Sequence, residues 1–482
     1  MPSAQLGPAS VVLDVGKTLS KASLWKADGR LIKRRVRANP RIHRDSYDAL
    51  DTAGIESWLV ESLKEFATLA EVTAIIPVAH GAAAAIVRGD RLVTPAFDYE
   101  SSIPEAIRNE YDALRDPFAF TGSPALGNGL NLGAQLYYQE SLLPRLLEDD
   151  ARILTWPQYW SWLLTGKAAS EITSLGCHSD LWRPRQAAPS QLSVSRGWAS
   201  HVAPLRAAAE VLGTLSPEWC ARTGLTGDVQ VHCGLHDSNA ALVAARGYPQ
   251  IAGRDATVLS TGTWFVAMRN LGDADSFQME NLSESRDCLV NVDIRGKLVP
   301  SARFMGGREI EVLTGADACR IESAAQQPAL LAALPRVLAS RAAVLPSFAP
   351  GSGPYASAPG SWVYPPADPY QRAAAISLYV ALLADTSLDL IGAGNTLLVE
   401  GRFAESELFV RALASLRPDC AVYVARAQHE VALGALRLLH PALGVDASLL
   451  RVSPLDHDLG GYRQQWQQLA HSNSNQTRGN AA

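Results

Sequence analysis

An aspartate at the head of a run of small residues is the side chain of this sequence best placed for proton transfer. Asp237 lies in the segment GLHDSNAALVA, residues 234–244, where the residues after it are typical of a helix. A carboxylate within hydrogen-bonding reach of a hydroxyl can act as a general base. The N-terminus of a helix also stabilises negative charge beside it. The alternative is that Asp237 only caps the helix, and the two roles are compatible.

A tight turn near the N-terminus carries the residue types of a phosphate site. In the segment LDVGKTLSK, residues 13–21, glycine permits close backbone approach, and threonine and amide groups can donate to phosphate oxygens. A carboxylate there can hold hydrated Mg²⁺. The segment lacks the GxxxxGK[ST] pattern, and by itself it favours an ordinary hairpin turn over a phosphate site. Its candidate residues are Asp14, Gly16, Lys17, Thr18 and Lys21.

A second turn of the same kind lies in the middle of the chain. The segment LSTGTWFVAM, residues 259–268, places Thr261, Gly262 and Thr263 between two apolar runs. Alone it predicts a turn without a ligand. Two such turns on two domains could bind one polyphosphate, which strengthens the joint hypothesis.

Strands and helices must position these turns, and their order predicts an α/β fold. The first run turns at Asp28-Gly29, which is typical of a hairpin, and residues 55–70 have helical spacing. A strand, a turn and a helix follow one another over residues 395–418, and residues 346–369 are expected to form a long loop. We expect an N-terminal domain over 1–247, a C-terminal domain over 248–465 and a disordered tail over 466–482.

The composition is that of an ordinary globular protein. The 482 residues exceed one ordinary core, which favours two large domains. With 47% hydrophobic residues, 19% charged residues and a net charge of −5, nucleic acid is not an expected partner. Six cysteines without a CxxC pair favour a reduced, cytoplasmic protein, and we expect no membrane span. A homodimer is expected from the general frequency of dimers alone.

Seven short motifs together resemble the FGGY carbohydrate kinases, in the same order along the chain. They cover about residues 10–440 and read LDVGKTLSK, AHG, GLHDSNAAL, STGTW, FMGGRE, EGRFAES and HEVALGAL. The resemblance implies two actin-like (ribonuclease H-like) domains with a central cleft for ATP and a sugar. It implies an ATP-dependent kinase that uses Mg²⁺.

The resemblance also implies roles for individual residues. Asp14 matches the magnesium-site aspartate, with Gly16, Lys17, Thr18 and Lys21 around the terminal phosphates, and Asp237 matches the catalytic base. The sugar-binding residues that the resemblance implies are His80, His236, Asp237 and Ser238. The ATP-binding residues implied in the second half are Thr261, Gly262, Thr263, Gly307, Gly401 and Arg402.

Two departures from the family pattern concern charge. Many relatives have Thr or Ser where this chain has Lys17, so an additional cation is expected to face the phosphates. Arg402 stands where the family usually has a second glycine, and it could stack on adenine or crowd it.

The substrate is predicted less directly than the reaction. The residue pair His-Asp at 236–237 and the motif STGTW look most like the rhamnulokinase branch and its fuculokinase-like neighbours, which implies a 6-deoxyketohexose such as L-rhamnulose or L-fuculose, or a ketopentose. Most aromatic residues of TWPQYWSWLLTG should be core, and one or two could stack on the sugar. The alternatives are a sugar-binding regulator of the same fold without turnover, and an ATPase that needs no sugar.

Overall fold

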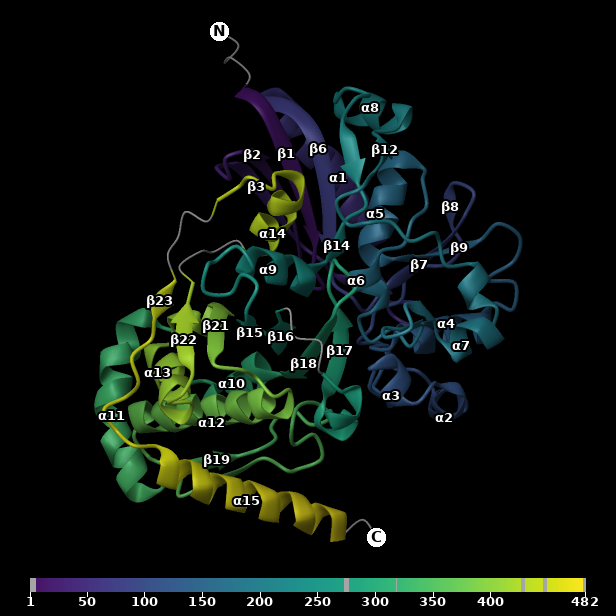
Figure 1. Cartoon of the computed structure of the whole chain (residues 1–482). Coiled ribbons are helices and arrows are strands. Elements are labelled where there is room, and N and C mark those ends of the chain that lie inside the picture. The colour runs from purple at the N-terminus through teal and green to yellow at the C-terminus, as the bar shows by residue number, and fades with distance from the viewer. Residues whose placement is uncertain (1–5, 273–276, 318, 426–429, 445–448, 480–482) are drawn as a thin grey trace. The chain divides into compact units, whose positions relative to one another are not determined.

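The computed structural model describes residues 6–272, 277–317, 319–425, 430–444 and 449–479, and the chain divides into two compact units (Figure 1). The first unit comprises Met1–Gly247, Val290–Leu298 and His429–Gly444. The second comprises Tyr248–Leu289, Val299–Gln428 and Val445–Ala482. Within the described residues, two mixed sheets of seven strands organise the fold. The predicted α/β fold class is confirmed.

The sheet of the first unit has the strand order β12-β13-β6-β1-β2-β3, and β14 also pairs with β6. Strands β1, β2 and β3 are antiparallel neighbours, whereas β6 runs parallel to β1, and β13 and β14 run parallel to β6. The predicted turn at Asp28-Gly29 joins β2 to β3, with Gly29 at φ 86°. The strands are β1 (Leu6–Val15), β2 (Leu19–Lys26), β3 (Leu31–Ala38), β6 (Ala70–Ala79), β12 (Val211–Thr214), β13 (Gln230–His232) and β14 (Leu235–His236).

The two faces of this sheet have different cores, as the alternation of side chains along β1 shows. Val11, Leu13 and Val15 are buried in a cluster with residues of α1 (Thr52–Leu69) and α5 (Trp156–Thr165). Val12 is buried in a second cluster, which includes Ala240 of α9 (Asp237–Ala245) and residues of α14 (Glu430–Leu439). By the same alternation Asp14 belongs to the face that α9 covers.

The remaining elements of the first unit are short helices and small sheets. Its other helices are α2 (Glu105–Leu114), α3 (Phe118–Thr121), α4 (Leu132–Leu142), α6 (Ile172–Leu175), α7 (Gln191–Ser195), η1 (Trp198–Ser200) and α8 (Pro217–Thr223). Its small sheets are β4 (Arg41–Ile42) with β5 (Ala49–Leu50), β7 (Ala84–Arg88) with β8 (Arg91–Leu92) and β9 (Arg152–Thr155), and β10 (Trp182–Arg183) with β11 (Ala188–Pro189).

Helix α14 returns to the first unit from late in the chain, where only the second domain was expected. Its small residues pack against those of α9, and a Cβ at Gly434 would lie 1.7 Å from the carbonyl oxygen of Ala240. Only glycine permits this distance, because there is no room for any side chain. The backbone of α14 therefore packs directly against the backbone of α9, the helix that begins at Asp237.

The second unit repeats the plan with the strand order β17-β18-β16-β15-β21-β22-β23. Its strands are β15 (Asp255–Thr261), β16 (Phe265–Leu271), β17 (Cys288–Val292), β18 (Leu298–Phe304), β21 (Thr396–Gly401), β22 (Ala421–Val424) and β23 (Leu450–Arg451), and β19 (Ala343–Leu345) pairs with β20 (Ser361–Val363). Its helices are η2 (Met279–Asn281), η3 (Glu284–Arg286), α10 (Gly306–Thr314), η4 (Ala324–Gln326), α11 (Gln327–Ser340), α12 (Pro369–Leu390), η5 (Arg402–Glu405), α13 (Glu407–Leu416) and α15 (Gly460–Gly479).

Helix α12 is the core helix of the second unit. It is long and apolar enough to cross a membrane by length and composition, but 89% of its most apolar window is buried within the protein. Its buried side chains lie on all sides, which is typical of a central helix in a large core.

The predicted disordered tail differs from the structure. Helix α15 runs from Gly460 to Gly479, and Trp466 and Ala470 are buried. The indole nitrogen of Trp466 donates to the carbonyl oxygen of Val344, 2.7 Å away. The prediction of disorder from residue 466 is wrong for this part of the tail, because two apolar side chains among polar ones suffice to dock a helix.

The contact between α9 and α14 generates a stability prediction. Replacement of Gly434 by Val places a side chain against the backbone of Ala240, and such overpacking costs about 1–3 kcal/mol or more. In urea-induced unfolding monitored by tryptophan fluorescence, we expect the midpoint of the transition to lie at a lower urea concentration than in the wild type. The control is Gly461→Ala, where no atom lies within 4 Å of the added Cβ. Equal midpoints for the two variants would contradict the close contact.

Candidate active site

Three parallel strands end at the same edge of the first sheet, and each delivers a predicted site residue there. Asp14 pairs with Val78 in the parallel register of β1 and β6, and Ala79 pairs with His236 in that of β6 and β14. His80 and Asp237 are the next residues of their segments. The strand order therefore gathers Asp14, His80 and Asp237, which are far apart in the sequence.

The first predicted phosphate turn is a hairpin closed by backbone hydrogen bonds. The amide of Gly16 donates to the carbonyl oxygen of Leu19 at 3.0 Å, and the Asn39 side chain donates to the carbonyl oxygen of Gly16 at 2.8 Å. Asp14 and Lys21 are register partners in β1 and β2, and the Lys21 ammonium lies 3.0 Å from Asp14 Oδ2. The turn thus presents a carboxylate with one cation beside it.

Asp14 lies in an environment that favours its protonated form. Burial raises the pKa of this carboxyl, Lys21 opposes the shift, and the negative charge of Asp237 adds to it. The two aspartates are therefore close enough to interact. A cation bound near both would relieve this repulsion.

Asp237 is the first residue of α9, and His236 precedes it as the N-cap residue. Its Oδ1 accepts a hydrogen bond from the amide of Ser238 at 2.6 Å. The Asp237 side chain is 30% exposed, so a ligand can reach it. Its location in the first helical turn lets it combine with the positive end of the helix.

His80 is a buried imidazole that lacks partners in the described residues. Both ring nitrogens are buried without a hydrogen bond, and the ring is 8% exposed. Burial and the nearby charge of Lys17 lower the pKa of His80 to about 3, so the ring is neutral at physiological pH. A neutral imidazole offers one donor and one acceptor, which suits a hydroxyl group. The rings of Tyr99 and Trp156 lie 5.5 and 6.2 Å away, centroid to centroid.

Lys17 does not have the free charge that was expected of it. Its ammonium group makes a short ion pair with the fully buried carboxylate of Asp98, and Glu100 lies 3.8 Å away. Arg41 also approaches Asp98, at 3.3 Å. The expectation of an additional cation facing phosphates is not supported, because the Lys17 charge compensates Asp98.

The second predicted turn joins β15 to β16 and is fixed from two sides. The Thr261 hydroxyl donates to the carbonyl oxygen of Glu400 at 2.6 Å and accepts from the amide of Phe403 at 3.0 Å. Thr261 is buried, so its hydroxyl has a structural task. The Gly262 amide donates to the carbonyl oxygen of Trp264 at 3.0 Å, and Thr263 is exposed.

Two predicted glycines pack directly on this turn. A Cβ at Gly307 would lie 2.3 Å from the carbonyl oxygen of Gly262, and one at Gly401 would lie 2.3 Å from that of Thr261. The structure therefore assembles Thr261, Gly262, Thr263, Gly307 and Gly401 in one place. Close backbone packing explains why glycine is needed at both positions.

Arg402 follows Gly401 but its guanidinium is already engaged. It makes a short ion pair with Glu322 and lies over the ring of Phe403, 5.3 Å from its centroid. The Arg402 side chain is 64% exposed. Neither contact holds it over the turn at Gly262.

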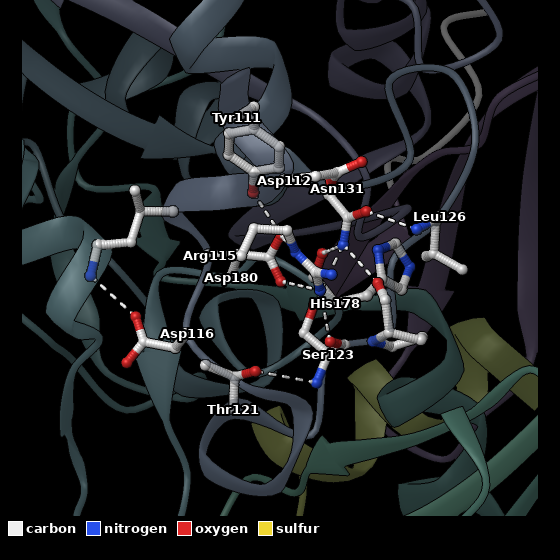
Figure 2. A network of polar contacts seen from close by, with 12 residues as sticks. Tyr111, Asp112, Arg115, Asp116, Thr121, Ser123, Leu126, Asn131, His178 and Asp180 are labelled. Atoms are coloured by element: carbon white, nitrogen blue, oxygen red, sulfur yellow. Dashed lines mark hydrogen bonds and ion pairs between the residues drawn. The ribbon is translucent and has the colours of Figure 1, made fainter. Parts of the chain in front are cut away.

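A buried polar network, which the sequence did not reveal, fixes the segment after α6 (Figure 2). Arg115 makes two hydrogen bonds of 3.0 Å to Asp180, and Asn131 donates to the carbonyl oxygen of His178 at 3.3 Å. His178 and Asp180 have φ values of 36° and 62°, a region that strains residues other than glycine. The network holds this strained backbone and with it the preceding residue, Cys177.

Other site residues were also missed. Asp98 and Tyr99 lie beside Lys17 and His80, but no motif connects them. Cys177 and Glu171 lie near His236, and the sequence motifs assign neither of them a role. Of the motif HEVALGAL, His429 and the side chain of Glu430 lie outside the described part of the chain.

The comparisons with known proteins give one family model, which matches the C-terminal part of the chain, and solved structures that match nearly all of it. The family described as "Carbohydrate kinase FGGY, C-terminal domain" matches residues 253–447. A carbohydrate kinase from Novosphingobium aromaticivorans is similar at 51% identity, with a TM-score of 0.90, over 96% of this chain and 98% of that one. No curated protein matches this chain.

Two more distant structures share the fold alone. A ligand-bound xylulose kinase from Lactobacillus acidophilus is 14% identical, with a TM-score of 0.78, over 98% of this chain and 99% of that one. The glycerol kinase of Plasmodium falciparum with ADP is 11% identical, with a TM-score of 0.79, over the same shares of 98% and 99%.

The ion pair of Lys17 yields a prediction that separates stability from nucleotide binding. Lys17→Met leaves the buried Asp98 carboxylate with fewer partners, which should cost about 1–3 kcal/mol of unfolding free energy in urea titrations. The KM for ATP should change less than about twofold. The control is Lys64→Met, which removes an exposed i,i+3 pair and should cost little. A tenfold rise in the KM for ATP with unchanged stability would contradict this prediction and indicate that Lys17 binds the phosphates of ATP.

Proposed function

This chain belongs to the FGGY carbohydrate kinase family, and from that premise we propose that it transfers the γ-phosphoryl group of ATP to a hydroxyl of a neutral ketose. The observation that carries the proposal is the gathering of Asp14, His80 and Asp237 at one edge of the first sheet. Asp237 is a carboxylate that a ligand can reach. His80 is a neutral imidazole whose ring nitrogens have no hydrogen-bond partner in the described residues, and Asp14 is a buried carboxylate beside Lys21. These are the groups that a hydroxyl acceptor and a phosphate donor require.

Asp237 is the proposed general base. A sugar hydroxyl that donates a hydrogen bond to its carboxylate loses the proton to it as the oxygen attacks the γ-phosphorus, and ADP leaves. The amide of Ser238 on Oδ1 keeps the carboxylate in one orientation. His236 lies beside Asp237, and His236 and Ser238 both belong to the proposed sugar site.

Asp14 is the proposed residue for Mg²⁺. Magnesium binds through one or two carboxylates together with phosphates and retains several waters, so a single aspartate suits it. The raised pKa of Asp14, caused by burial and in part by Asp237, is the electrostatic setting that a cation would improve. When bound, the ion would neutralise phosphate charge. Lys21 and the backbone of the turn at Lys17 and Thr18 are proposed to contact the same phosphates, while the Gly16 amide closes the turn on Leu19.

The second unit is the proposed nucleotide half. Its turn at Gly262 and Thr263, backed by Gly307 and Gly401, leaves room for backbone groups to approach phosphates closely. Gly307 lies in the first turn of α10, and its amide donates to the carbonyl oxygen of Thr263 at 3.2 Å, which ties this helix end to the turn. Thr261 supports this site through its hydrogen bonds, and Arg402 is proposed to lie at its margin.

The charge of the proposed sugar site favours a neutral substrate over a sugar acid. Lys17 is compensated by Asp98 and Glu100, and His80 stays neutral, while Asp237 carries a negative charge. An aldonate would meet carboxylates without a free cation. The half-buried ring of Tyr99 beside His80 suits an apolar face or a methyl group, which supports a 6-deoxyketohexose or a ketopentose, whereas Trp156 is fully buried.

A substrate panel tests the proposed function. We expect ADP release from Mg-ATP to depend on one or a few of L-rhamnulose, L-fuculose, ribulose and xylulose, tested as both enantiomers where available. Gluconate should give none, because its carboxylate would meet Asp237 while Lys17 is already paired with Asp98. ADP release without any sugar would instead favour an ATPase, and release with gluconate alone would contradict the charge argument.

Removal of the proposed base should affect turnover and not sugar binding. Asp237→Asn keeps the size of the side chain but cannot accept the proton, so kcat should fall by roughly 10²–10⁴. The affinity for the active sugar, measured by calorimetry, should change little. Ser238→Ala, a neighbouring change that keeps the backbone amide, should retain most of the turnover. Unchanged kcat in Asp237→Asn would remove Asp237 from this role.

A further inference from the structure

A cysteine and a histidine meet directly beside the proposed base. Cys177 Sγ lies 3.7 Å from His236 Nε2, and that same nitrogen lies 3.2 Å from Asp237 Oδ1. Cys177 and His236 are both buried. Gly81 makes room for them, since a Cβ there would lie 2.6 Å from the sulfur. The three side chains form a continuous line from thiol to carboxylate.

The contact suits an ionised pair. Burial alone would raise the pKa of Cys177, but the neighbouring imidazoles of His178 and His236 outweigh it and lower the pKa to about 5. Burial alone would lower the pKa of His236, but Cys177, together with Asp237 and Glu171, raises it to about 9. The two pKa values are shifted in the directions that a thiolate beside an imidazolium requires.

The other side of the His236 ring faces Asn239. Asn239 Nδ2 lies 3.4 Å from His236 Nδ1, and Asn239 Oδ1 is buried without a hydrogen-bond partner in the described residues.

Four further titratable groups face this pair. Asp237 and Glu171 are acidic, and burial raises the pKa of Glu171 to about 7. His178 follows Cys177, and its Nδ1 donates to the carbonyl oxygen of Leu130 at 2.7 Å. His80, at the end of β6, is neutral. On the side opposite Asn239, His236 Nε2 thus contacts two acidic groups, the Cys177 sulfur and the Asp237 carboxylate.

We propose that Cys177 is a positioning residue for catalysis, whose thiolate keeps His236 protonated so that the imidazolium holds Asp237 by Oδ1. This role rests on the proposed function, in which Asp237 is the base. The contacts of Asp237 with His236 and Ser238 both use Oδ1, which leaves Oδ2 for the sugar hydroxyl.

The pH profile of kcat/KM tests the coupling. Because the pKa of His236 is raised, its charge is present at neutral pH and is lost as the pH rises through about 9, so wild-type kcat/KM should fall there. In Cys177→Ser the thiolate is absent and only Asp237 and Glu171 oppose the effect of burial, so the fall should move to lower pH. In His236→Gln this limb should be absent, and adding Cys177→Ser should change the profile no further.

Cys233→Ser is the matched control. Cys233 is fully buried in the same unit, but burial raises the pKa of its thiol, so it is uncharged over this pH range. Its profile should match the wild type. Identical profiles for wild type and Cys177→Ser would overturn the positioning role.

The ultraviolet absorbance of the thiolate tests the ion pair without any turnover. At pH 7, without ATP or sugar, the wild type should show one thiolate more than Cys177→Ser and the same number as Cys233→Ser. Equal absorbance of wild type and Cys177→Ser would overturn the pair even in an active kinase. A wild-type protein that shows the thiolate but phosphorylates no sugar would instead contradict the proposed function, and with it the role of Cys177 in catalysis.

Discussion

The parallel pairing of β1, β6 and β14 is the constraint on which the proposed active site depends. Parallel strands end at a common edge, so residues that follow them are brought together whatever their distance in the sequence. Asp14, His80 and Asp237 are separated by many residues, yet each stands at or just beyond such a strand end. A shift of β14 by one residue against β6 would exchange His236 and Asp237 between the faces of the sheet.

The distribution of charge around this edge follows from burial. Charged groups are costly inside a protein unless they are paired. Lys17 pairs with Asp98, Lys21 pairs with Asp14, and Cys177 contacts His236, whereas His80 avoids the cost by remaining neutral. The proposed sugar site therefore presents a neutral imidazole and a carboxylate, and the charges of Lys17 and Lys21 are paired with aspartates. This is the basis on which we propose an uncharged, hydroxylated substrate.

In each unit, a proposed functional segment is fixed by a close contact between backbones. In the first unit, Gly434 of α14 lies against Ala240 of α9, the helix that begins at Asp237. In the second, Gly307 and Gly401 lie against the turn at Thr261 and Gly262. Both arrangements use backbone against backbone, which is more rigid than contact between flexible side chains. Rigid placement is what a general base and a phosphate turn need.

The sequence by itself determined the local elements and the identity of the main candidates. The hairpin at Asp28-Gly29, the helix near residues 55–70 and the strand before His80 follow from turn residues and periodicity, which act over a few positions. The motifs around Asp14 and Asp237 were recognisable for the same reason.

Only the tertiary structure decided the partners of these residues. Lys17 pairs with Asp98, and Cys177 contacts His236, at separations of 81 and 59 residues. The return of residues 290–298 and 429–444 to the first unit, and the docking of Trp466, also depend on distant segments. Such contacts are set by which strands and helices pack together, and no spacing within a short stretch of sequence encodes that choice.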